Sequence, residues 1–320
     1  MRRDQFEIGL EREYALYAWI DGTLAYLLAN DRLLAAFHEH VAADPERAHA
    51  WEQMRAAGWR IDREYSHCLV EIASPPVTRA GWATLLAGFS RLEEWLTHAA
   101  ARLHRSSRFD RIECTAELSV RTDRFVAWDG TFVTTFAELL LNPGDDNWLL
   151  GSPENIPACL SAPELSYAGF TSTNATVHPP HHGEIAEQAT ELADYYWLIL
   201  HAARTLDVYT PQRHPLLHEG RIAVPPDPEL TIRDALIRWG DPSTAALLDT
   251  IDIGDGPARF HALFGQPPSA AFSAGWFHAY SCRPRVVENT MLFELRCFHS
   301  GLPLANLGPL LDIAARLRSR

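Results

Sequence analysis

Lysine is absent from this 320-residue chain, and all 28 of its basic residues are arginines. A Walker A loop and a protein-kinase fold each need a lysine at the nucleotide phosphates, and a pyridoxal phosphate enzyme needs one for its Schiff base. The composition therefore excludes these three classes. Any phosphate chemistry in this chain must use arginine and metal ions.

Cysteines and long apolar runs are also scarce. The five cysteines are scattered and form no C-x-x-C pair, so neither a zinc site nor a disulfide framework is expected. No apolar run approaches the ~20 residues of a membrane-spanning helix, and the acidic residues of MRRDQFEIGLERE argue against a secretory signal. A net charge of −13 disfavours nucleic-acid and membrane partners. We expect a cytoplasmic protein.

The order of the predicted elements favours an α+β fold. Alternating or β-branched residues predict strands in five segments, at about 5–19, 58–74, 111–128, 168–180 and 285–299. Helical periodicity predicts helices at 79–104, 183–207, 304–319, 24–43 and 229–250. No G-x-G-x-x-G follows a strand, and no repeat or linker divides the chain. We therefore expect one domain over 1–320, an antiparallel sheet with helices packed on one face.

Two strand segments carry glutamates within apolar sequence. In IGLEREYAL, Glu11 and Glu13 are two residues apart and so share one face of a strand. Glu71 lies in the middle of SHCLVEIASPP, where two prolines end the strand. Glu64 has the opposite parity to Glu71, so we expect it to share that face only through a bend or bulge.

Two later segments insert polar residues in the same way. The alternating residues of FTSTNATVHPP are Ser172, Asn174, Thr176 and His178. In TMLFELRCFHSG, Glu294 and Arg296 are two residues apart among apolar neighbours, and Arg283 and Arg285 precede them in SCRPRV. Clustered carboxylates avoid their repulsion by coordinating a hard divalent cation such as Mg²⁺. Arginine offers phosphate or carboxylate a permanently charged fork, so the segments together predict a phosphoryl-transfer site.

Each of these segments also has a plainer interpretation, which the sequence leaves open. Glu11 and Glu13 could face solvent on an edge strand, and Glu71 could belong to a buried ion pair. Glu294 and Arg296 could be each other's partners. RIECTAELSVRTD alternates just as cleanly and is interpreted as a solvated sheet surface.

Taken in order, the segments resemble the glutamate–cysteine ligase family, in particular its carboxylate–amine ligase branch (type 2), in the glutamine synthetase-like superfamily. The family's opening G-x-E-x-E-[FY] is similar to Gly9–Tyr14, and its second glutamate strand is similar to VEIASPP. Its late E-x-R strand, approached through arginine-proline-arginine, is similar to SCRPR and Glu294-Leu295-Arg296. The chain has His299 where the late motif usually continues to aspartate, and Asn174 and Thr176 where the middle strand usually has histidines.

The resemblance implies a curved, mainly antiparallel sheet in the shape of a half-funnel, backed by helices and holding ATP with two or three Mg²⁺ ions. It implies metal ligands at Glu11, Glu13, Glu71, Glu294, Asn174 and Thr176. Arg296 and Glu71 are the implied catalytic residues. The implied ATP- or substrate-binding residues are Arg283, Arg285, Arg296, Glu64, His178 and His299.

The implied activity joins a small-molecule carboxylate to an amine as an amide, such as a γ-glutamyl bond, through an acyl phosphate. Two alternatives stay open. One is a phosphotransferase of the same fold, similar to guanidino kinases. The other is a non-catalytic binding or regulatory member, suggested by His299, Asn174 and Thr176. The sequence names neither the acid nor the amine, which could be free, peptidic or carrier-bound, and it leaves a homo-oligomer open.

Overall fold

The computed structural model describes most of the first 133 residues and several shorter pieces beyond them. The described residues are 6–64, 66–116, 122, 124–133, 172–178, 217–218, 221–222, 282–287, 290–299, 303–308 and 311. The helices predicted at 183–207 and 229–250 lie outside these residues, as does most of the one predicted at 304–319, which begins with the 3-10 helix η6 (Leu304–Leu307).

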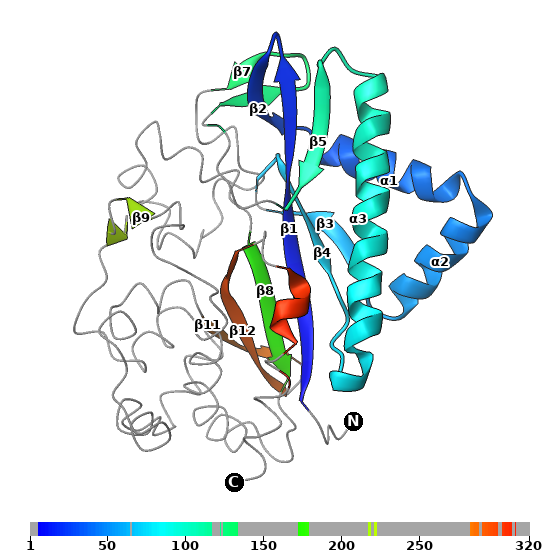
Figure 1. Ribbon diagram of the computed structural model, residues 1–320, viewed down its shortest axis with the longest axis vertical. Helices are drawn as coiled ribbons and strands as arrows, with labels where there is room; N and C mark the ends of the chain where they lie inside the picture. Colours follow the sequence, from blue (N-terminus) through cyan, green and yellow to red (C-terminus); the bar gives the residue numbers. More distant parts are fainter. Residues whose placement is uncertain are drawn as a thin grey trace.

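A mixed, mostly antiparallel sheet organises the described residues (Figure 1). Its strands run in the order β11 (Cys282–Val287), β12 (Thr290–His299), β8 (Ser172–His178), β1 (Glu7–Ile20), β2 (Thr23–Leu28), β6 (Phe125–Ala127), β7 (Phe132–Val133). β4 (Leu69–Ala73) and β5 (Arg111–Thr115) also pair with β1, and β3 (Arg60–Arg63) pairs with β4. The β2–β6 pair is parallel. β9 (Leu217–His218) and β10 (Arg221–Ile222) pair separately.

Strand β1 is the element on which the sheet is built. Its first half pairs with β8 and β4, and its second half pairs with β5 and β2. The strand predicted at 5–19 is thus confirmed within one or two residues of each end. Since β1 has partners on both sides along its length, it is an interior strand of the sheet.

Three helices gather on one side of β1 (Figure 1). They are α1 (Asn30–Ala42), α2 (Pro45–Ala56) and α3 (Trp82–Arg105), the last preceded by the single turn η1 (Arg79–Gly81). Helix α3 buries residues at helical spacing, including Leu85, Phe89, Leu92 and Leu96, so the helix predicted at 79–104 is confirmed. Helix α1 contacts α3 and β3, and α3 contacts β5.

Four predicted elements are wrong in their boundaries. Residues 24–43 are not one helix, because Asp21 and Gly22 adopt φ values of 51° and 73° and form the two-residue turn of the β1–β2 hairpin before α1. Residues 58–74 and 285–299 are not single strands: they contain the antiparallel hairpins β3–β4 and β11–β12, the second of which begins three residues earlier. The segment 111–128 divides into β5 and β6.

The two faces of β1 have different surroundings. Its even-numbered residues, among them Leu10, Tyr14 and Leu16, belong to the main hydrophobic core beneath the helices. Ala15 and Tyr17 belong to a second cluster on the opposite face. The α+β class is therefore confirmed. No helix in the described part of the chain is long and apolar enough to cross a membrane.

Candidate active site

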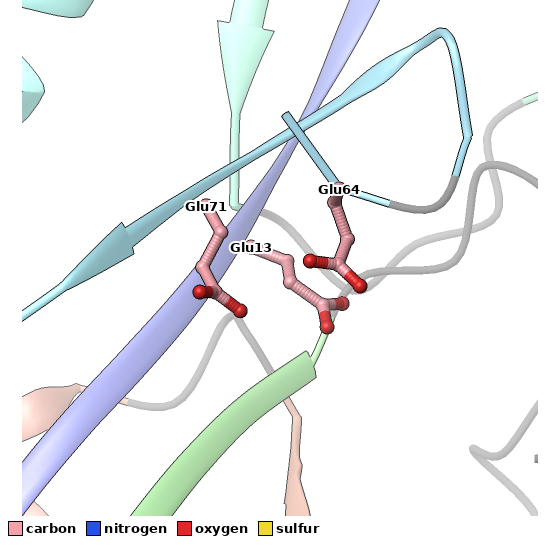
Figure 2. A group of neighbouring side chains, drawn as sticks. All are labelled: Glu13, Glu64 and Glu71. Carbon is pink, nitrogen blue, oxygen red and sulfur yellow. The ribbon is translucent and has the colours of Figure 1, made fainter. Parts of the chain in front are cut away.

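Three glutamates converge on the face of the sheet that turns away from the helices. Glu13, Glu64 and Glu71 each place a carboxylate oxygen within 4.8 Å of the other two, and Figure 2 shows the carboxylates turned toward one another. Glu13 is 4% exposed, and Glu64 and Glu71 are half-buried. We call this group the carboxylate cluster. Three oxygen donors at this spacing form a ligand set that suits a hard divalent cation.

Strand register explains why Glu13 and Glu71 meet. They are direct partners in the β1–β4 pair, and side chains of paired residues project from the same face of a sheet. The interior position of β1 and the burial of Glu13 show that the exposed-edge interpretation is wrong for this residue. Alternation decides which residues share a face within each strand, and the register of the β1–β4 pair brings Glu13 and Glu71 to the same side.

Glu64 joins the cluster for a reason that the parity argument missed. β3 and β4 form a hairpin in which Asp62 pairs with Glu71, and the Glu64 amide donates to the Leu69 carbonyl at 3.3 Å. Across a hairpin with this register, residues of opposite sequence parity share a face. The change of direction that the parity of Glu64 and Glu71 requires is thus the turn of the β3–β4 hairpin.

Glu11 lies on the same face but outside the carboxylate cluster. It pairs with Ala73 of β4 on one side and with Asn174 of β8 on the other. Its Oε1 atom is 3.8 Å from a terminal nitrogen of Arg60, and its side chain is 21% exposed. Of the two glutamates in IGLEREYAL, Glu13 thus belongs to the carboxylate cluster and Glu11 lies beside Arg60.

Strand β8 brings its predicted residues beside Glu11. Asn174 is buried, whereas Thr176 and His178 are half-buried, and these three residues pair in register with alternate residues of β1. Because Asn174 is the direct partner of Glu11, the predicted Asn174 and Thr176 lie on the face that carries the carboxylates. Their proposed metal ligation stays a prediction.

The late strand is placed beside β8 by its backbone. Glu294 pairs with Thr176 and, on its other side, with Arg283. Arg285 pairs with Leu292, and His299 pairs with Ser172. The register shifts between Leu295 and Phe298, so Arg296 sits in a β-bulge. The side chains of Glu294, Arg296, Arg283, Arg285 and His299 lie outside the described part of the structure.

A cavity of about 360 Å³ extends along this face of the sheet from Glu11. Its polar lining comes from Glu11, Arg60, Ser74, Thr176 and His178, and its apolar lining includes Gly58 and Pro75. We call it the strand cavity. Sequence reasoning missed Arg60 and Ser74 as lining residues. The alternation of Arg60, Asp62 and Glu64 was the signal that a polar strand face began there.

Part-buried hydrogen bonds connect the opposite face of β1 to helix α3. The Tyr14 hydroxyl donates to Glu93 Oε1 at 2.7 Å, and Arg12 donates to the same oxygen at 3.0 Å. Burial and then the negative charge of Glu93 raise the pKa of Tyr14 well above its ordinary value. Since Arg12 and Tyr14 alternate with Glu11 and Glu13, this contact fixes the strand segment that carries the glutamates.

No protein-family model matches the chain, and no curated protein matches it. The resemblance to carboxylate–amine ligases therefore rests on the sequence motifs alone. The four strands that carry these motifs are neighbours in the sheet, in the order β12, β8, β1, β4.

Proposed function

We propose that this chain is an ATP- and Mg²⁺-dependent carboxylate–amine ligase that forms an amide, of the γ-glutamyl type suggested by the resemblance. The observation that carries the proposal is the carboxylate cluster, in which Glu13 is 4% exposed. Buried like charges repel strongly unless a cation compensates them. An all-oxygen donor set fits Mg²⁺, which also prefers substrate phosphates as ligands.

In this proposal Glu13, Glu64 and Glu71 hold Mg²⁺, which neutralises charge on the transferring phosphoryl group. The acid substrate attacks the γ-phosphorus of ATP, so an acyl phosphate forms and ADP leaves. The amine then attacks the acyl carbon, and inorganic phosphate leaves. Arg296, beside β8 in the bulge, is the proposed stabiliser of the transferring group. Glu11, Glu294, Asn174 and Thr176 stay proposed metal ligands from the neighbouring strands. A half-funnel curvature of the sheet also belongs to this proposal.

The test is an ADP-release screen of amino acids and other acids against amines, with Mg²⁺ present. We expect ADP release that requires both an acid and an amine, together with an amide detected by mass spectrometry. Glu71→Gln should lower turnover at least about 100-fold, because it removes one ligand and one neutralising charge. Glu52→Gln on the exposed surface of α2 is the matched control and should retain full turnover.

Two outcomes would favour the alternatives. The carboxylate cluster would serve any Mg²⁺-dependent phosphoryl transfer, so a stable phosphorylated product without an amide would indicate a phosphotransferase. Failure of calorimetry to detect Mg·ATP binding, together with no turnover for any acid and amine pair, would indicate a non-catalytic binding protein.

A further inference from the structure

Arg60 of β3 contributes a permanent positive charge to the lining of the strand cavity. It belongs to the lining together with Glu11 of β1 and with Thr176 and His178 of β8. The cavity therefore spans the strands on both sides of β1. A permanent cation, a carboxylate and an imidazole line this open cavity of about 360 Å³, which is large enough for a small-molecule ligand.

The sheet register explains how Arg60 reaches Glu11. Arg60 pairs with Ala73 of β4, and Ala73 pairs with Glu11 of β1, so the three residues form one row across three strands. The middle residue of the row has a methyl side chain. The long arginine side chain can therefore pass over Ala73 and bring its guanidinium to the carboxylate.

The contact between Arg60 and Glu11 is weak by its geometry. The nitrogen–oxygen distance is 3.8 Å, which exceeds hydrogen-bond length, and the Arg60 side chain is 64% exposed. Ion pairs of this kind contribute little to stability. A guanidinium held this loosely can exchange the contact for a ligand oxyanion, which it can bind through two parallel hydrogen bonds.

We propose that the strand cavity binds its ligand through an oxyanion, and that Arg60 is the residue that recognises this group. Phosphate and carboxylate share the required chemistry, so the oxyanion belongs either to a nucleotide or to an organic acid. The proposal deepens the ligase function by adding a specificity residue that none of the motifs contains. It concerns equilibrium binding and does not depend on whether an amide is formed.

The test is calorimetry on the full chain with two probes, MgADP and glutarate, a dicarboxylate that lacks an ammonium group. We expect Arg60→Gln to raise the dissociation constant of one probe about tenfold or more and to leave that of the other unchanged, because a bidentate charged contact is lost. The weakened probe identifies the source of the oxyanion. Circular dichroism and an unchanged melting temperature check that the variant is folded.

Arg63→Gln is the matched control. Arg63 is exposed on the same strand, but it pairs with Val70 and so lies on the other face of the sheet. The Arg63→Gln variant should bind both probes with wild-type affinity. Arg60→Lys, which keeps the charge and loses the planar fork, should bind the affected probe with intermediate strength.

A second variant examines the competition between Glu11 and the ligand. In metal-free buffer Glu11→Gln should bind glutarate or inorganic phosphate at least as tightly as the wild type, since it removes the carboxylate next to Arg60. The proposal is overturned if wild-type protein binds neither MgADP nor glutarate, or if Arg60→Gln binds both with wild-type affinity. Either result leaves a positive ADP-release screen intact, so failure here is distinguishable from failure of the ligase function.

Discussion

Replacing Glu71 by glutamine should raise stability in a chelator and should lower the stability gained from a divalent cation. In the carboxylate cluster, each oxygen lies within 4.8 Å of the two others. Two unit charges at that distance repel by about 3 kcal/mol at an effective dielectric constant of about 20, and by about 1 kcal/mol in water. Glu71 is half-buried, so the relevant value per pair lies between these limits.

In a chelator at pH 8, Glu71→Gln should therefore raise the free energy of unfolding by about 1–3 kcal/mol for each of the two pairs that Glu71 forms, with Glu13 and with Glu64. Mg²⁺ should stabilise the wild type more than the variant, because only the wild type keeps its full ligand set. A cation at about 100 times its dissociation constant stabilises the folded wild type by about 2.7 kcal/mol.

The assay is urea unfolding followed by tryptophan fluorescence, in EDTA and in saturating Mg²⁺, with Glu52→Gln as the exposed control. The control should unfold as the wild type does in both buffers. The reasoning is refuted if Glu71→Gln is less stable than the wild type in EDTA and gains as much as the wild type from Mg²⁺. That result would mean that Glu71 is a structural partner of its neighbours and not a metal ligand.

Three further predictions concern the elements that support the site. Gly88→Ala in α3 should destabilise the fold by about 1–3 kcal/mol in urea unfolding, although alanine has the better helix propensity. The reason is that the Cβ atom of the new alanine would lie 2.3 Å from the Trp59 ring. A gain in stability would contradict this prediction. Tyr14→Phe should cost about 1 kcal/mol by the same measurement, since it removes the part-buried hydrogen bond to Glu93, and an unchanged midpoint would count against a stabilising role of this bond. Burial lowers the pKa of His40 below its ordinary value of 6.5, so the unfolded state takes up a proton before the folded state does. Stability should therefore fall as the pH drops through 6.5 toward the folded-state pKa. In a pH series of melting temperatures, His40→Gln should make this fall less steep.

Much of the site follows from local periodicity. The alternation around Glu13 and the apolar setting of Glu71 predicted two inward carboxylates on strands, and the structure pairs them directly. The period-2 pattern of β8 predicted that Asn174 and Thr176 share a face. These predictions succeed because the direction of a side chain along a strand depends only on the chain itself.

Predictions that depended on where a strand ends were less successful. The run 58–74 has no strong turn signal and is predicted as one strand, in which Glu64 reaches the face of Glu71 only through a bend or bulge; the structure has a hairpin there. The Asp21-Gly22 turn was visible in the sequence, but the apolar residues after it also suit a helix. A single break changes the parity of every later residue, so the sequence did not predict that Glu64 lies beside Glu13 and Glu71.

By itself, the sequence determined the residue types available for chemistry, the absence of lysine, the strand character of β1 and the helical period of α3. The tertiary structure alone decided that Glu64 completes a cluster with Glu13 and Glu71, and that Arg60 reaches Glu11 across Ala73. The physical reason is that face and period are properties of one segment. Which residues become neighbours depends on the register between segments, and hairpin length and packing set that register only when the chain folds.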